Sequence, residues 1–146
     1  TEESTSETIP TFAELGLHPE VLRAVESLGY ESPSPIQAAT IPALVDGRDV
    51  IGLAQTGTGK TAAFALPALS RTDLFHAVPQ TLVLVPTREL AVQIHSDAEK
   101  LGRHTGLKLA CVYGGVDYEK QRRQFDDGAD SRRLKLQLHI IHEKIF

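Results

Sequence analysis

The strongest chemical signal in the sequence is the run Ala54-Gln55-Thr56-Gly57-Thr58-Gly59-Lys60-Thr61. Apolar residues 50–54 lead into it and helix-forming residues 62–66 follow it. Strand, glycine-rich turn and helix, in this order, form the context that a phosphate-binding loop requires. Gly57 and Gly59 lack a Cβ, so the backbone can curl and point its N–H groups at one anion. The run therefore predicts a site for the phosphates of a nucleotide.

Lys60 and Thr61 are the two candidate catalytic residues of this loop. The Lys60 ammonium can place a charge on the outer phosphates, and the Thr61 hydroxyl can ligate a Mg²⁺ that the nucleotide carries. A helix that opens here adds unpaired N–H groups and its positive dipole end. The strict pattern begins with glycine, where this chain has Ala54. The alternative is a glycine-rich turn with an exposed lysine, and the specificity of Gly-Lys-Thr in this context argues against it.

Length and composition restrict the class of protein. The 146 residues suffice for one domain with a buried core that needs no metal or disulfide. Hydrophobic residues make up 41% and charged residues 23%, which is ordinary for a globular protein and argues against a disordered chain. The formal net charge of −4 argues against binding nucleic acid by bulk charge. Any contact with nucleic acid must then be local.

The single cysteine, Cys111, suits a reducing compartment and predicts no disulfide, either internal or to a partner. It lies in an apolar run, which favours a small core residue over a reactive thiol. No stretch approaches the roughly 20 apolar residues of a membrane helix. Residues 1–8 are polar and lack the apolar core of a secretion signal. We therefore expect a cytoplasmic protein with no membrane contact.

Apolar periodicity predicts the elements that position the loop, after a disordered lead-in over residues 1–9. Helices are predicted for residues 19–28, 35–46, 61–69, 89–101 and 118–125. Pro42 lies inside the second helix, so we expect a bend or break near Ile41. Strands are predicted for residues 50–54, 81–85 and 109–113. Their nearly continuous apolar character is typical of strands buried on both faces, so we predict an α/β fold with a parallel sheet and helices on both faces.

Residues 131–146 follow a different pattern. Between Leu134 and Ile140 apolar residues alternate with polar ones, a period of two that the earlier strands lack. Either unrelated sequence follows Asp130, or residues 135–141 replace a missing strand. The abrupt change favours unrelated sequence, and a paired strand in this segment would contradict that interpretation.

With these motifs in view, the chain resembles the DEAD-box family of ATP-dependent RNA helicases. The resemblance covers residues 10–130 and implies the first of the family's two RecA-like lobes. The phosphate loop is the family's form, in which alanine commonly replaces the leading glycine. Gly29-Tyr30 and Ser34-Pro35-Ile36-Gln37, with Phe12 upstream, resemble the Q motif. Residues 86–93 resemble motif Ia, and Gly114-Gly115 resembles the family's glycine pair.

The resemblance implies a site for ATP or ADP with Mg²⁺. A glutamine amide can pair bidentately with N6 and N7 of adenine, whereas guanine would leave a mismatch. Gln37 is therefore the candidate for adenine selection, with Tyr30 flanking the base and Phe12 packing behind it. Without the family match, Gln37 would be interpreted as a surface helix residue. The phosphate side of this site is assigned to Gln55, Thr56, Gly57, Thr58, Gly59, Lys60 and Thr61.

The resemblance also implies contacts with the backbone of single-stranded or duplex RNA. The candidates are Pro86, Thr87, Arg88, Gly114 and Gly115. A hydroxyl, a guanidinium and free N–H groups converge where the helix after residues 81–85 begins, which suits a phosphate. The alternative for Thr87 is an ordinary helix cap beside a solvated arginine, and the glycine pair by itself would indicate only a turn.

The family pattern is incomplete after Asp130, because the Thr-Pro-Gly-Arg element, the Asp-Glu-Ala-Asp box and the second lobe are missing. A Mg²⁺ would lose its acidic partner and the attacking water its positioning carboxylate. We therefore expect a truncated lobe that binds nucleotide and does not by itself hydrolyse ATP or unwind RNA. The alternatives are a non-catalytic binding module and an unrelated phosphate-loop nucleotide kinase. An unfinished sheet also makes self-association plausible.

Overall fold

The structure is a computed structural model that describes residues 8–73, 80–107, 109–113 and 138–142. Its elements, in chain order, are a single 3-10 turn η1 (Phe12–Glu14), α1 (Pro19–Ser27), α2 (Pro35–Val45), α3 (Lys60–Arg71), β1 (Thr81–Leu84), α4 (Arg88–Leu101), β2 (Leu109–Tyr113) and β3 (Leu138–His142). The first four predicted helices are confirmed, as are the strands predicted for residues 81–85 and 109–113. The helix predicted for residues 118–125 lies outside the described residues.

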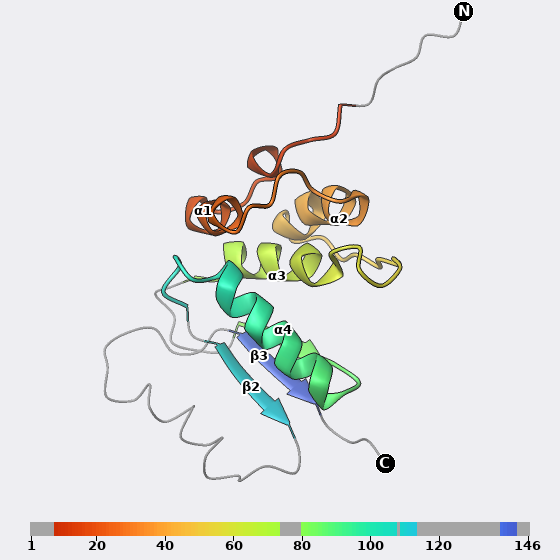
Figure 1. The fold of residues 1–146 in the computed structure, drawn as a ribbon, viewed down its shortest axis with the longest axis vertical. Coiled ribbons are helices and arrows are strands. Elements are labelled where there is room, and N and C mark those ends of the chain that lie inside the picture. Colours follow the sequence, from red (N-terminus) through yellow and green to blue (C-terminus); the bar gives the residue numbers. More distant parts are fainter. Residues whose placement is uncertain (1–7, 74–79, 108, 114–137, 143–146) are drawn as a thin grey trace, which may run out of the picture.

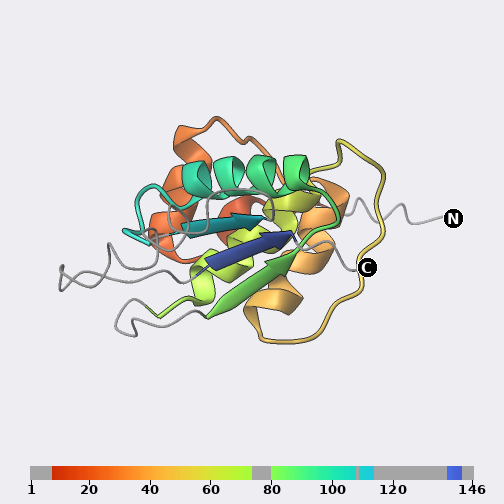
Figure 2. The same cartoon turned by 90° about the horizontal axis from the view of Figure 1, so that it is seen from below.

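The three described strands form one parallel sheet in the order β1-β3-β2. Val83 of β1 and Cys111 of β2 both stand in register with Ile140 of β3. All strand arrows in Figure 2 accordingly point the same way. The predicted α/β fold with a parallel sheet is confirmed.

The central strand comes from the segment that we expected to be unrelated sequence. β3 pairs along its whole length with β2 and over residues 138–141 with β1. The preferred interpretation of residues 131–146 is therefore wrong for residues 138–142, and the alternative, a strand within residues 135–141, is confirmed for residues 138–141. The physical reason is pairing, because an apolar strand between two parallel neighbours satisfies its backbone groups on both sides.

The phosphate loop is not preceded by a strand. Residues 48–55 form no regular element, and Ile51 and Leu53 are 95% and 92% exposed. The predicted strand over residues 50–54 is therefore wrong. A strand needs a neighbour for its backbone groups, and among the described residues β1, β2 and β3 pair only with one another. An apolar sequence thus remains in water for lack of a partner strand.

The described helices cover one face of the sheet. Val83 of β1 and Cys111 of β2 pack with Ala91, Ile94 and Ala98 of α4, and Phe64 of α3 joins the same cluster. On the opposite face, Leu82 and Leu84 are 58% and 71% exposed. The expectation that β1 is buried on both faces is therefore wrong: its residues alternate between half-buried and exposed.

A second apolar cluster joins the helices to one another. α1 and α2 stack on α3 in Figure 1, and α2 makes its main contact with α3. Ile41, Val21, Val25 and Leu66 at the centre are fully buried. α2 continues through Pro42 without the expected break, because the burial of Ile41 in this cluster stabilises the helix. Among the described residues, no helix is long and apolar enough to cross a membrane.

Cys111 is buried, as expected of a small core residue. Burial raises the pKa of its thiol, because the thiolate would lose its hydration. As the pH rises above about 8.5, the unfolded chain therefore loses this proton first, and the fold loses stability. We expect the urea midpoint to fall between pH 7.5 and 9.5 by more in the native protein than in Cys111→Ala. Equal losses in both proteins would contradict the buried, neutral thiol.

Candidate nucleotide site

The phosphate loop joins the exposed segment 48–55 to the first turn of α3. Gly57 and Gly59 both have left-handed backbones, with φ of 83° and 82°. Gly59 is the residue before the helix, and its carbonyl accepts the first helical hydrogen bond, from the Ala63 N–H. The glycines therefore occupy the backbone conformations that only glycine adopts at low cost. The expected curl of the backbone at these two glycines is confirmed, and the binding of an anion by the loop stays a prediction.

The polar side chains of the loop contact its own backbone. Lys60 Nζ donates to the Ala54 carbonyl at 2.7 Å, and Thr58 Oγ1 donates to the Gln55 carbonyl at 2.6 Å. The Lys60 bond spans the loop from its first residue to the start of α3. Because Lys60 is exposed, its ammonium could leave the Ala54 carbonyl and donate to a phosphate oxygen.

The start of α2 is tied to the same loop by two hydrogen bonds. Ser34 Oγ donates to the Thr58 carbonyl at 2.8 Å, and Gln37 Nε2 donates to the Gly59 carbonyl at 3.1 Å. Gln37 Oε1 accepts from the Ser34 N–H at 2.9 Å, which fixes the amide at the first turn of the helix. Gln37 is only 4% exposed. Glutamine and loop, more than twenty residues apart in sequence, are thus brought into direct contact.

The role of Ser34 was missed by sequence reasoning. Ser34 is the N-cap residue of α2, and its hydroxyl holds the backbone of the phosphate loop. The spacing Ser34-x-x-Gln37 matches the capping-box pattern and could have signalled the bond between the two residues. The contact of either residue with the loop had no local signal, because it depends on how α2 packs against α3.

The two aromatic residues of the predicted adenine site contact each other. Phe12 and Tyr30 meet edge to face, with ring centroids 5.9 Å apart. Phe12 is 4% exposed and belongs to the helical core, whereas Tyr30 is 41% exposed. Phe12 thus supports Tyr30 from behind, and Tyr30 offers a partly open ring to a ligand. This placement is compatible with the expectation that Tyr30 flanks the base and Phe12 packs behind Tyr30.

The predicted motif Ia residues open α4. Thr87 caps the helix, since its Oγ1 accepts from the Leu90 N–H at 3.2 Å. Pro86, Thr87 and Arg88 are exposed. Figure 2 shows the start of α4 and the phosphate loop at the same end of the sheet, where the strand arrows point. Gly114 and Gly115 lie outside the described residues.

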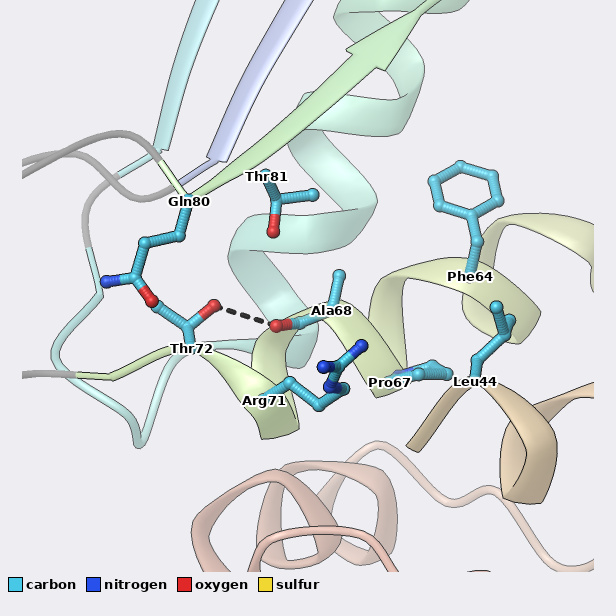
Figure 3. A pocket seen from close by; sticks show the side chains of 8 residues that line it. All are labelled: Leu44, Phe64, Pro67, Ala68, Arg71, Thr72, Gln80 and Thr81. Atoms are coloured by element: carbon cyan, nitrogen blue, oxygen red, sulfur yellow. Dashed lines mark hydrogen bonds between the residues drawn. The ribbon is translucent and has the colours of Figure 1, made fainter. Parts of the chain in front are cut away.

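A pocket of about 360 Å³ lies apart from these residues. It opens beside the start of β1 and the later turns of α3. Figure 3 shows its lining side chains, which are Leu44, Phe64, Pro67, Ala68, Arg71, Thr72, Gln80 and Thr81. None of the predicted site residues is among them. The predicted nucleotide site, formed by the loop and α2, is therefore separate from this pocket.

The site fits a Mg²⁺-bound nucleotide in part. Backbone N–H groups at the start of α3, the left-handed glycines and the Lys60 ammonium form a donor set for phosphates. The Thr61 hydroxyl is half-buried in the first turn of α3 and could ligate the ion. Within the described ranges, no group of three His, Cys, Asp or Glu side chains could hold a metal. The ion would therefore be carried by the nucleotide, with Thr61 as its protein ligand.

Comparison with known sequences identifies a family. The model of the DEAD/DEAH box helicase family matches residues 34–141. An ATP-dependent RNA helicase DeaD from Mycobacterium tuberculosis is 58% identical over 123 residues, or 82% of this chain and 21% of that protein. The DEAD-box ATP-dependent RNA helicase CshA from Bacillus cereus is 50% identical, and the match covers 90% of this chain and 23% of that protein. The chain thus spans about a fifth of the length of these curated relatives.

Solved structures agree with the sequence match. The RNA-helicase Prp28 from Chaetomium thermophilum bound to ADP has a TM-score of 0.75 and 36% identity, and the match covers 97% of this chain and 34% of that one. A variant of Dbp5 from S. cerevisiae bound to RNA and ADP BeF3 has a TM-score of 0.75 and 30% identity, over 90% of this chain and 32% of that one. Each match covers at least 90% of this chain.

Proposed function

The chain belongs to the DEAD/DEAH box helicase family, and on that premise we propose that it is the nucleotide-binding part of an ATP-dependent RNA helicase. The observation that carries the proposal is the hydrogen bond from Gln37 to the Gly59 carbonyl. It brings the residue suited to adenine against the loop suited to phosphates. A base and a phosphate chain of one adenine nucleotide could then be bound side by side.

Gln37 selects adenine in this proposal. Its amide carries two N–H donors and two acceptor positions, of which the described bonds to Gly59 and Ser34 use one each. One donor and one acceptor therefore remain for N7 and N6 of adenine, and the same pair does not match guanine. Tyr30 flanks the base and Phe12 supports Tyr30, as their edge-to-face contact suggests.

Lys60 and Thr61 act on the phosphates and the ion. Lys60 exchanges its bond to the Ala54 carbonyl for a phosphate oxygen, and Thr61 ligates the Mg²⁺ that the nucleotide brings. A bound Mg²⁺ would neutralise part of the negative charge on the phosphates. The chain's own residues bind and orient the nucleotide. The sequence contains no Asp-Glu-Ala-Asp box, so we propose that this chain by itself does not hydrolyse ATP.

RNA is the proposed second ligand, bound through its backbone. Pro86, Thr87 and Arg88 are exposed at the start of α4, at the same end of the sheet as the phosphate loop. Helix N–H groups and a guanidinium there suit a phosphate and carry no base preference. The solved relative bound to RNA and ADP BeF3 supports this assignment by analogy. Gly114 and Gly115 remain part of the proposal as its second backbone contact.

Thermal unfolding tests the nucleotide site. The chain has no tryptophan, so circular dichroism is the suitable signal. Mg-ADP at about 100 times its dissociation constant is expected to add about 2.7 kcal/mol, which raises the Tm by several degrees, whereas Mg-GDP adds little. Lys60→Ala should abolish the ADP effect, and Lys100→Ala, which removes an exposed lysine of α4, should preserve it. Equal effects of ADP and GDP, or none from either, would reject the proposed site.

A further inference from the structure

The helix α1 is capped by a histidine ring. Nδ1 of His18 accepts a hydrogen bond from the Glu20 N–H at 3.2 Å. Pro19, the first helical residue, has no N–H, and the Val21 N–H donates to the His18 carbonyl at 3.0 Å. The ring therefore satisfies the amide that the first turn would otherwise leave without a partner. Serine, threonine, asparagine and aspartate usually fill this position, and none of them changes charge between pH 5 and 8 as histidine does.

The same residue ties the start of α1 to α3. The His18 N–H donates to Ser70 Oγ of α3 at 3.1 Å. One turn along, Val21 and Val25 are fully buried in the cluster that joins these helices. At the other end of α1, the Val25 carbonyl accepts from the Tyr30 N–H at 3.2 Å. A loss of the cap would therefore act on the helix to which Tyr30 is bonded.

The elements around the ring offer it no charged partner. His18 is exposed, and within the described part of the chain no charged side chain lies within ion-pair distance of its ring. Ser70, its contact on α3, is uncharged, and the adjacent Arg71 packs over Gly47. The Glu14 carboxylate of η1 accepts from a backbone N–H of its own turn. The cap bond thus decides which form of the ring the fold favours.

We propose that His18 makes the cap of α1 dependent on pH. A protonated imidazole carries a donor on both nitrogens and cannot accept from the Glu20 N–H. It also places a positive charge at the positive end of the helix dipole. The Glu20 carboxylate would attract that charge, but it lies 3.9 Å from Arg23 Nη1, with which it forms an ion pair.

The sign of the effect follows from proton binding. The unfolded chain takes up the proton without losing a hydrogen bond, whereas the folded chain loses the cap. The contribution of the cap to stability is therefore present at pH 7.5 and is lost as the pH falls through about 6.5, where histidine ordinarily titrates. This inference does not depend on the proposed function.

Urea unfolding at pH 7.5 and at pH 5.5 tests the cap. Asparagine is among the best capping residues and does not titrate, so His18→Asn keeps an acceptor at both pH values. The urea midpoint of wild type should fall on acidification by about 0.3 M more than that of His18→Asn. His104→Asn is the matched control and should fall as wild type does. Its ring lies 3.4 Å from Ser27 Oγ, a hydroxyl that can accept from a neutral or a charged imidazole.

Equal falls in wild type and in His18→Asn would overturn the proposal. Nuclear magnetic resonance of wild type provides a measurement that needs no variant. At pH 7.5 the His18 ring should carry its proton on Nε2, and the Glu20 amide signal should move with the same midpoint as the ring when the pH is lowered. A proton on Nδ1 at pH 7.5, or a Glu20 amide that does not respond to the titration of the ring, would also overturn the proposal.

Discussion

Replacing Leu66 with alanine is expected to lower the free energy of unfolding by about 2–5 kcal/mol. Leu66 lies in α3, is fully buried, and belongs to the cluster through which α1 and α2 pack on that helix. Alanine leaves a cavity, and the surrounding helices collapse into it only in part. Because a domain is stable by about 5–15 kcal/mol in total, the loss is a large share of it. Urea unfolding followed by circular dichroism measures the change.

Leu53→Ala is the matched control. It removes the same atoms from a side chain that is 92% exposed in the segment before the phosphate loop. A surface substitution of this kind is expected to change stability by less than about 0.5 kcal/mol. Similar losses in the two variants would mean either that α3 is not the centre of the core or that residue 53 is buried. Both outcomes would contradict the structure.

Gly59→Ala should both destabilise the fold and abolish nucleotide binding. The left-handed backbone of Gly59 costs an L-residue about 1–2 kcal/mol. A Cβ there would also collide with Nε2 of Gln37, a nearly buried residue whose Oε1 is held by Ser34 and whose Nε2 is held by the loop. Displacing that amide loses two hydrogen bonds of about 1 kcal/mol each. We expect a Tm lower by many degrees and no response to Mg-ADP.

Gly57→Ala separates the cost of the left-handed backbone from the cost of displacing the Gln37 amide. Its backbone is also left-handed, with φ of 83°, and a Cβ there would meet no atom within 4 Å. It should therefore lose only the backbone contribution of about 1–2 kcal/mol. The difference between the alanine variants measures the contact between Gln37 and the loop. If the two variants are equally destabilised, Gln37 does not pack against Gly59 as the structure has it.

Local chemistry determined much of this protein. The left-handed positions of Gly57 and Gly59, the cap at Thr87 and the amphipathic helices follow from a few neighbouring residues each. Conformational limits and capping act within one or two turns, so sequence alone carries the information. Two strands, four helices and the phosphate loop were predicted from the sequence for this reason, whereas the family was predicted from the resemblance of several motifs.

Tertiary structure decided the rest, because strand pairing and side-chain partners depend on residues that are distant in sequence. Residues 50–54 have an apolar strand pattern but lack a neighbouring strand among the described residues, so Ile51 and Leu53 remain exposed. Residues 138–142 were judged unrelated by pattern and became the centre of the sheet, since two strands were available to pair with them. Gln37 likewise acquired its loop contact only when α2 packed on α3.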